Sequence, residues 1–134
     1  MKPIFVDTGA WFALADRSDQ YHERALEIFS GILPNHPLLT SNLVVSETHI
    51  LIRRTIGHAA AIQFLEGINE SRRIQKIYST HILEEMAVEI LKKFSDQDFS
   101  FTDAVSFAIM KQHGIRQAFA FDRHFATAGY SLIA

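Results

Sequence analysis

Apolar residues follow two alternating periodicities along the chain, one typical of strands and the other of helices. Short β-rich runs such as PIFVD are followed by longer stretches in which apolar residues recur every three or four positions. The runs predict strands at 3–7, 37–41, within 73–79, at 117–122 and, as a short edge strand, at 130–134. The longer stretches predict helices at 9–17, 20–33, 43–56, 58–71, 81–94 and 100–114.

This alternation of strands and helices predicts a parallel sheet with helices on both faces, connected by right-handed crossovers. The expected fold class is therefore α/β, a three-layer α/β/α sandwich. A chain of 134 residues is long enough to bury one core, and its composition changes nowhere as a linker would require. We expect a single domain over residues 1–134.

Capping residues support several helix boundaries. Glycines at helix ends and short polar residues at helix starts are the expected signals. The predicted N-caps are Thr8, Asp19, Ser41 or Asn42, Thr80 and Ser100, and the predicted C-terminal glycines are Gly57 and Gly114.

Composition and charge exclude several classes of protein. The chain is 48% hydrophobic and 21% charged, which is typical of a globular protein, and its net charge of -2 does not suit a globally basic nucleic-acid coat. The absence of cysteine excludes disulfides, thiolate catalysis and cysteine-based metal sites. No apolar run approaches a membrane span, and Asp7 interrupts the first run too early for a signal peptide. We expect a cytoplasmic protein without a membrane segment.

The sequence Asp-Thr-Gly at Asp7 to Gly9 is compatible with two unrelated chemistries. In aspartic proteases it supplies half of a carboxylate pair, whereas in metal-dependent nucleases an aspartate that ends the first strand holds a cation. Aspartic proteases are built from strands, but here two predicted helices follow Asp7 at once. The pattern favours the metal site. A phosphatase with an aspartyl nucleophile is disfavoured, because it would require a second aspartate at the position of Gly9.

Asp7 and Asp122 both end predicted strands. Ligands of open α/β sheets bind beyond the carboxyl ends of the strands, so both carboxylates are expected at that crevice. The alternative role for each is that of a turn or cap residue.

Glu47 and Asp103 lie on predicted helices. Glu47 falls on or beside an apolar stripe, where a carboxylate requires a partner, unless the position lets it reach water or Arg54. Asp103 fits a capping box with Ser100 at the start of a nearly apolar, and hence buried, helix. Asp98, close by, is interpreted as a solvated loop residue.

These four carboxylates would repel one another if the fold brought them together, unless a divalent cation neutralised them. Carboxylates and water suit Mg²⁺ or Mn²⁺, and zinc is disfavoured without cysteine or a suitably spaced histidine pair. The histidines, among them His22, His49 and His124, are interpreted as surface or capping side chains.

The segments FVDTGAW, SNLVVSETHIL, DFSFTDAVSFAIMKQHGI and AFAFDRHF together resemble a PIN domain, in particular the compact VapC-like ribonucleases that serve as toxins in toxin-antitoxin pairs. The resemblance covers essentially the whole chain. It implies an acidic pocket that binds Mg²⁺ or Mn²⁺, endonucleolytic cleavage of RNA, a small antitoxin partner and a homodimer. The implied catalytic and metal-binding residues are Asp7, Glu47, Asp103 and Asp122.

Neighbouring residues complete the expected site. Thr8 and Thr102 are candidates to orient water or phosphate behind the ligands, although each is also a plausible capping residue. Arg116 and Arg123 are the favoured RNA-binding residues, because both flank the strand predicted to end at Asp122. The leading hypothesis is a metal-dependent endoribonuclease. The alternative is a PIN-like scaffold that binds RNA or a protein without cleaving.

Overall fold

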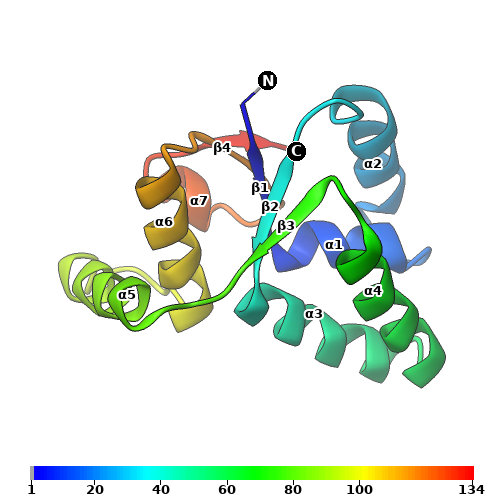
Figure 1. Cartoon of the computed structure of the whole chain (residues 1–134), viewed down its shortest axis with the longest axis horizontal. Helices are drawn as coiled ribbons and strands as arrows, with labels where there is room; N and C mark the ends of the chain where they lie inside the picture. Colours follow the sequence, from blue (N-terminus) through cyan, green and yellow to red (C-terminus); the bar gives the residue numbers. More distant parts are fainter. Residues whose placement is uncertain (1) are drawn as a thin grey trace.

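The computed structural model describes residues 2–134 and contains a five-stranded parallel sheet in the order β3-β2-β1-β4-β5 (Figure 1). Every neighbouring pair of strands runs parallel, with Phe5 of β1 beside Leu39 on one side and Ala118 on the other. The strands are β1 (Ile4–Val6), β2 (Leu38–Ser41), β3 (Ile74–Ile77), β4 (Gln117–Phe119) and β5 (Ser131–Ile133).

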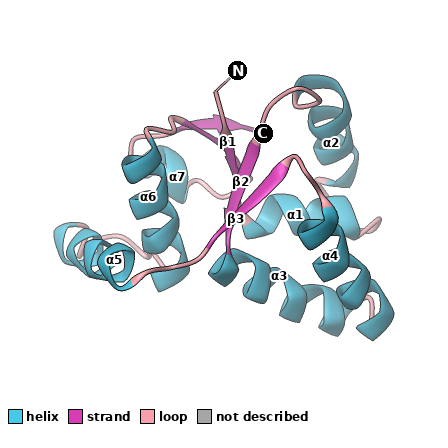
Figure 2. Cartoon of the chain, viewed as in Figure 1, coloured by secondary structure: helices cyan, strands magenta, loops and turns pink. Residues whose placement is uncertain are grey.

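Helices cover both faces of the sheet. One group, in which α1 contacts α2 and α3 while α3 contacts α4, lies on one side, and α5, α6 and α7 lie on the other (Figures 1 and 2). The predicted three-layer α/β/α sandwich is therefore confirmed. The helices are α1 (Thr8–Ala15), α2 (His22–Glu27), α3 (Asn42–Thr55), α4 (His58–Glu70), α5 (His81–Lys93), α6 (Phe101–His113) and α7 (His124–Thr127).

The core lies between the central strands and the helices. All residues of β1 and β2 are buried, as a parallel sheet covered on both faces requires. Helix α6 is buried from Asp103 to Met110, which confirms the prediction from its apolar sequence. In the part of the chain that the structure describes, no helix is long and apolar enough to cross a membrane.

The predicted caps were correct where a hydroxyl begins a strongly periodic helix. Ser41, Thr80 and Ser100 each accept a hydrogen bond from the backbone of their helix, and Gly114 adopts the left-handed conformation with φ of 65°. Two caps were wrong: Asp7, not Thr8, precedes α1, and Tyr21, not Asp19, precedes α2.

The structure differs from the sequence expectation in three segments. The helix predicted at 20–33 is divided into α2 and a π-helical turn, η1 (Ile28–Ile32). The strand predicted to reach Asp122 ends at Phe119, and the short helix α7 that follows was not predicted. A helix of four residues has too few turns to produce a recognisable apolar period.

Candidate active site

The carboxyl ends of β1 and β4 bring acidic residues to one edge of the sheet. Asp7 follows β1 directly, and its backbone N–H donates to the carbonyl of Phe119 at the end of β4, at 3.1 Å. Its own carbonyl accepts from Ala10 and Trp11 in the first turn of α1. These contacts fix the backbone of Asp7 between strand and helix, and the residue is only 5% exposed.

Asp103 enters this edge from the first turn of α6. Its Oδ2 accepts from the backbone N–H of Ser100 at 3.0 Å, while its own N–H donates to Ser100 Oγ at 3.0 Å. This is the predicted capping box. The capping contact uses one carboxylate oxygen, so the cap does not exclude a second function for the other.

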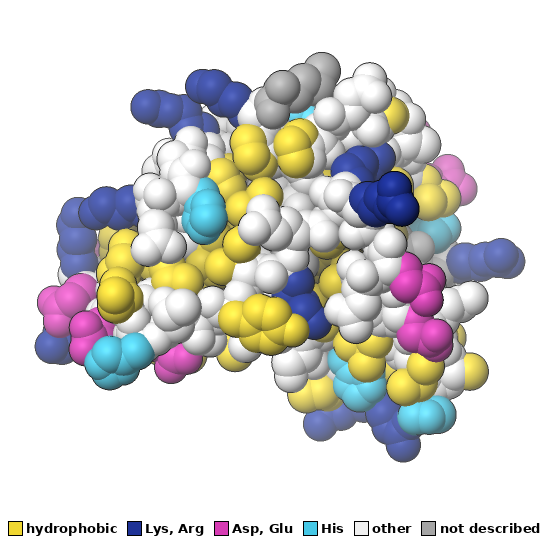
Figure 3. Space-filling view, viewed as in Figure 1, with side chains coloured by type: hydrophobic (Ala, Val, Ile, Leu, Met, Phe, Trp, Pro, Cys, Tyr) yellow, Lys and Arg dark blue, Asp and Glu magenta, His cyan; other side chains and the backbone are white. Residues whose placement is uncertain are grey.

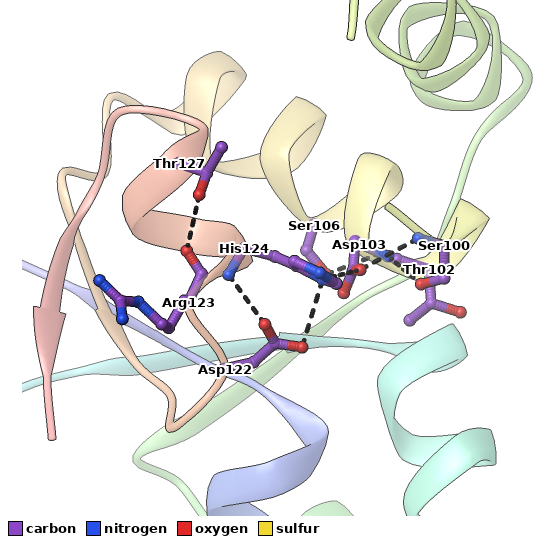
Figure 4. Close-up of polar contacts among 8 residues, drawn as sticks. All are labelled: Ser100, Thr102, Asp103, Ser106, Asp122, Arg123, His124 and Thr127. Carbon is purple, nitrogen blue, oxygen red and sulfur yellow. Dashed lines mark hydrogen bonds and ion pairs between the residues drawn. The ribbon is translucent and has the colours of Figure 1, made fainter. Parts of the chain in front are cut away.

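Asp122 lies in the turn between β4 and α7, and a histidine joins it to Asp103 (Figure 4). The Nδ1 atom of His124 lies 2.9 Å from Asp103 Oδ2 and 3.3 Å from Asp122 Oδ2. The backbone N–H of His124 also donates to Asp122 Oδ1 at 2.8 Å. One ligand atom from each of these three residues lies within 4.8 Å of the others.

His124 was interpreted from the sequence as a surface or capping side chain, and this interpretation was wrong. The side chain is 29% exposed and its ring packs edge-on against Phe99, with ring centroids 5.3 Å apart. Phe99 in turn packs against Phe107 in the core. The only sequence signal was its position two residues after Asp122, which also occurs in ordinary turns.

The carboxylate of Asp7 lies in an unfavourable environment for a negative charge. Burial raises its pKa from 3.8 to about 7, and the nearby charges of Asp103, Glu47 and Asp122 add to the effect. The backbone N–H of Thr8 acts in the opposite direction but does not cancel it. The four predicted acids therefore act on a common electrostatic site.

Glu47 and the two threonines occupy different environments within this site. Glu47 is exposed on α3, at the margin of the buried stripe formed by Val44, Thr48 and their neighbours, and it forms no ion pair with another described residue. The hydroxyl of Thr8 is buried beside Asp7 with no hydrogen-bond partner among the described residues. Thr102 is half-buried, and its carbonyl accepts from Ser106.

The two favoured arginines lie beyond opposite ends of β4. Arg123 is exposed between Asp122 and His124, and its side chain points away from the carboxylates (Figure 4). Arg116 precedes β4, where its carbonyl accepts from Ser131 at the start of β5. The structure does not bring Arg116 to the acidic group, because the strand separates the two ends. Two residues that flank a strand in the sequence lie at opposite ends of that strand, so they do not belong to one site.

Comparisons with known proteins agree with this geometry. The model of the PIN domain family matches residues 4–129. The 23S rRNA-specific endonuclease VapC20 of Mycobacterium tuberculosis is 39% identical over 127 residues, which cover 95% of each chain. A VapC ribonuclease of Archaeoglobus fulgidus is 28% identical over 110 residues, covering 80% of this chain and 69% of that protein.

The similarity extends to solved structures. The crystal structure of VapC20, described as a sarcin-ricin loop cleaving toxin, has a TM-score of 0.88 and again covers 95% of each chain. FitAcB from Neisseria gonorrhoeae has a TM-score of 0.71 at 16% identity, covering 98% of this chain and 96% of that chain, and this likeness shows the fold alone. The chain belongs to the PIN domain family, within its VapC-like toxin ribonucleases.

Proposed function

We propose that residues 1–134 form a single nuclease domain that cleaves RNA endonucleolytically with the help of Mg²⁺ or Mn²⁺. The observation that carries this proposal is the convergence of Asp7, Asp103 and Asp122 at one edge of the sheet, with Glu47 at its margin. These carboxylates come from separate elements, and a fold that needed them only as caps would not gather them. The similarity to VapC20 over nearly the whole chain supports RNA as the substrate.

The residues present fit a hard divalent cation. Carboxylate oxygens are the donors that Mg²⁺ and Mn²⁺ prefer, and no cationic side chain among the described residues forms an ion pair with Asp7. The buried Thr8 hydroxyl, which lacks a partner, supplies a polar atom next to Asp7 for a water or a phosphate oxygen. Asp7, Asp103, Asp122 and Glu47 would hold the ion.

When bound, a divalent cation lowers the pKa of water and stabilises the negative charge that develops on a phosphate during hydrolysis. The protein's own side chains hold the carboxylates of the site in position. His124 holds Asp103 and Asp122 in a fixed relation through Nδ1, and the capping box anchors Asp103 to α6. In the reaction, water adds to phosphorus and the bond to the leaving ribose oxygen breaks.

The RNA substrate that we propose is a structured ribosomal RNA loop of the kind that VapC20 cleaves. This assignment rests on 39% identity over 95% of both chains. We propose that Arg123, exposed and next to Asp122 in the chain, contacts the RNA backbone on the outer side of the acidic group.

A cleavage assay tests the proposal directly. Purified protein should cut a sarcin-ricin stem-loop RNA in Mn²⁺, and EDTA should stop the reaction. Asp122→Asn should lose more than about 100-fold in rate, beyond the roughly 10–100-fold typical of removing an outer partner of a metal site. The matched control is Asp98→Asn, since Asp98 is exposed and lies outside the cluster. Undiminished cleavage in EDTA, or an equal loss in both variants, contradicts the proposal. Binding without any cleavage would support the scaffold alternative.

The toxin role adds partners to this activity. We propose that a small antitoxin protein holds the nuclease inactive and that two copies of the chain form a homodimer. Exposed apolar side chains support the proposal of an interface: Tyr78 directly follows β3, and Ile82 and Val88 lie on α5. Figure 3 shows that apolar side chains reach the surface on one face of the molecule. Expression of the chain without antitoxin should slow growth, and Asp7→Asn should restore it. Equal growth inhibition by both forms contradicts the role.

A further inference from the structure

An aromatic pair lies next to the acidic site and has no part in the chemistry described so far. Tyr21 stacks on Phe121 with ring centroids 4.5 Å apart and ring planes 3° from parallel. Phe121 is half-buried and contacts Phe119 of the core edge-on, whereas Tyr21 is 41% exposed. The pair therefore has an anchored ring on the inside and a ring accessible to solvent on the outside.

Chain connectivity brings the backbone of this pair close to Asp122. Phe121 directly precedes Asp122, and consecutive Cα atoms are about 3.8 Å apart. Arg123 follows, so a stacking surface, a metal-site carboxylate and an exposed cation occur on three successive residues. A nucleotide whose phosphate lies near Asp122 would have its base within reach of the aromatic rings.

The loop before α2 holds Tyr21 in place before any ligand arrives. Asp16 Oδ1 accepts from the backbone N–H of Ser18 at 3.0 Å, and Asp19 Oδ1 accepts from the N–H of Tyr21 at 2.9 Å. His22 Nδ1 lies 2.7 Å from the carbonyl of Ala13, which joins the start of α2 to α1. A preorganised ring loses little conformational freedom when a ligand stacks on it.

We propose that Tyr21 and Phe121 form a stacking platform for one unpaired base of the RNA substrate, next to the phosphate that is cleaved. Proteins recognise structured RNA loops largely through splayed bases that stack on aromatic side chains. The inference rests on the proposed ribonuclease function and adds to it a specificity-determining contact. Tyr21 and Phe121 would contact the base of the nucleotide, whereas Arg123 would contact the phosphate backbone.

Fluorescence tests the platform without requiring cleavage. A sarcin-ricin stem-loop carries 2-aminopurine at one loop position at a time, and the protein carries Asp7→Asn so that the RNA stays intact. Binding of the RNA to the protein should quench the 2-aminopurine fluorescence at one loop position. Tyr21→Ala should abolish that quench and weaken binding about tenfold, whereas Tyr21→Phe should preserve both. Leu26→Ala, a change at an exposed apolar residue of α2, the helix that follows Tyr21, should have no effect.

A kinetic cycle in the cleaving protein provides the second measurement. Tyr21→Ala should lower kcat/KM about tenfold on intact RNA but have little effect on RNA that lacks the base at the quenched position, because the two changes remove the same contact. Additive losses overturn the platform. So does a quench at no position, or one that Tyr21→Ala leaves unchanged.

The failure of the proposed function gives a different result. If the wild-type protein never cleaves RNA in Mn²⁺ while the quench still depends on Tyr21, the nuclease function is overturned and the platform stands. If Tyr21→Ala weakens only inhibition by a protein partner and leaves RNA binding and cleavage unchanged, the platform is overturned.

Discussion

Asp7 and Asp103 lie at the same edge of the sheet and are both buried, but their surroundings differ. Asp103 accepts hydrogen bonds from the backbone of Ser100 and from His124, at 3.0 and 2.9 Å. For the Asp7 carboxylate the backbone N–H of Thr8 is not enough to offset burial, and its pKa is raised to about 7. The protein itself stabilises the charge of Asp103, whereas it leaves the carboxylate of Asp7 in an environment that disfavours a negative charge. The cation that we propose would act mainly on Asp7.

The largest expected effect concerns the pH dependence of stability without metal. Folded protein keeps the Asp7 proton up to about pH 7, while the unfolded chain releases it near 3.8, so the folded state binds more protons in between. The free energy of unfolding should therefore fall as pH rises from about 4 to 7, by roughly 4 kcal/mol from Asp7 alone. Urea unfolding in EDTA across this range measures the slope.

Asp7→Asn is the matched variant for this prediction. It removes the titrating group, so its stability should lack this part of the pH dependence and exceed that of the wild type near pH 7. Asp103→Asn should keep most of the slope, because burial is the main cause of the raised pKa of Asp7 and the charge of Asp103 only adds to it. Identical pH profiles for wild type and Asp7→Asn would show that Asp7 is not the group responsible.

The next effect is stabilisation by the cation. Mn²⁺ at about a hundred times its Kd should add roughly 2.7 kcal/mol to the stability of the folded state and raise the Tm by several degrees. Asp122→Asn should reduce this gain in stability for two reasons. It relieves repulsion between carboxylates in the metal-free protein, and it weakens cation binding in the metal-bound protein. Thermal melts in EDTA and in Mn²⁺ measure both. If the variant is less stable in EDTA and has an unchanged Mn²⁺ shift, Asp122 is only a turn residue.

A smaller change in stability is expected for Asp103→Asn, and it distinguishes the capping role of Asp103 from its proposed role as a metal ligand. Asp103→Asn keeps the size of the side chain and part of the hydrogen bonding to Ser100, so we expect a loss of about 1 kcal/mol in stability. Cleavage should nevertheless be almost abolished. Circular dichroism and denaturant titration report the first quantity and an RNA cleavage assay the second. Full unfolding of the variant would mean that the cap is the main function of Asp103.

The smallest effect concerns the arginines. Arg123→Ala should weaken RNA binding and reduce the salt dependence by about one ion, as expected when one phosphate contact is lost. Arg116→Ala serves as the control, because Arg116 precedes β4 and so lies at the end of this strand that is far from Asp122. Binding titrations at several salt concentrations give the slopes. An unchanged slope for Arg123→Ala places the RNA elsewhere.

The sequence predicts most of the fold because its strongest signals are local. The strand-like run before Asp7, the hydroxyl caps at Ser41 and Thr80, and the capping box at Ser100 all depend on neighbouring residues. The segment directly after Phe119 was harder to predict from the sequence, since a turn and the four-residue helix α7 are too short to show an apolar period. The helix at 20–33 was predicted as continuous because a π-helical turn leaves the apolar pattern nearly unchanged.

The candidate site follows the same division. Position at strand ends was enough to propose that Asp7 and Asp122 lie at a common edge, since chain topology brings the carboxyl ends of parallel strands together. The resemblance to PIN domains added Asp103 and Glu47 to the expected group. Contacts made by turns were not predictable in this way. The bridge from His124 to Asp103 spans 21 residues and depends on how α7 packs, and the stack of Tyr21 on Phe121 spans a far greater separation. Such pairs become visible only in three dimensions.

The order of the strands also determines when the site can exist during synthesis. β4 pairs with β1, but it is made after β2, β3 and the helices α1 to α6, and Asp122 and His124 follow it. A nascent chain that has not yet reached β4 contains Asp7 and Glu47 but lacks the strand whose carbonyl at Phe119 fixes the backbone of Asp7. The acidic group can therefore assemble only after the ribosome has made the segment that follows β4.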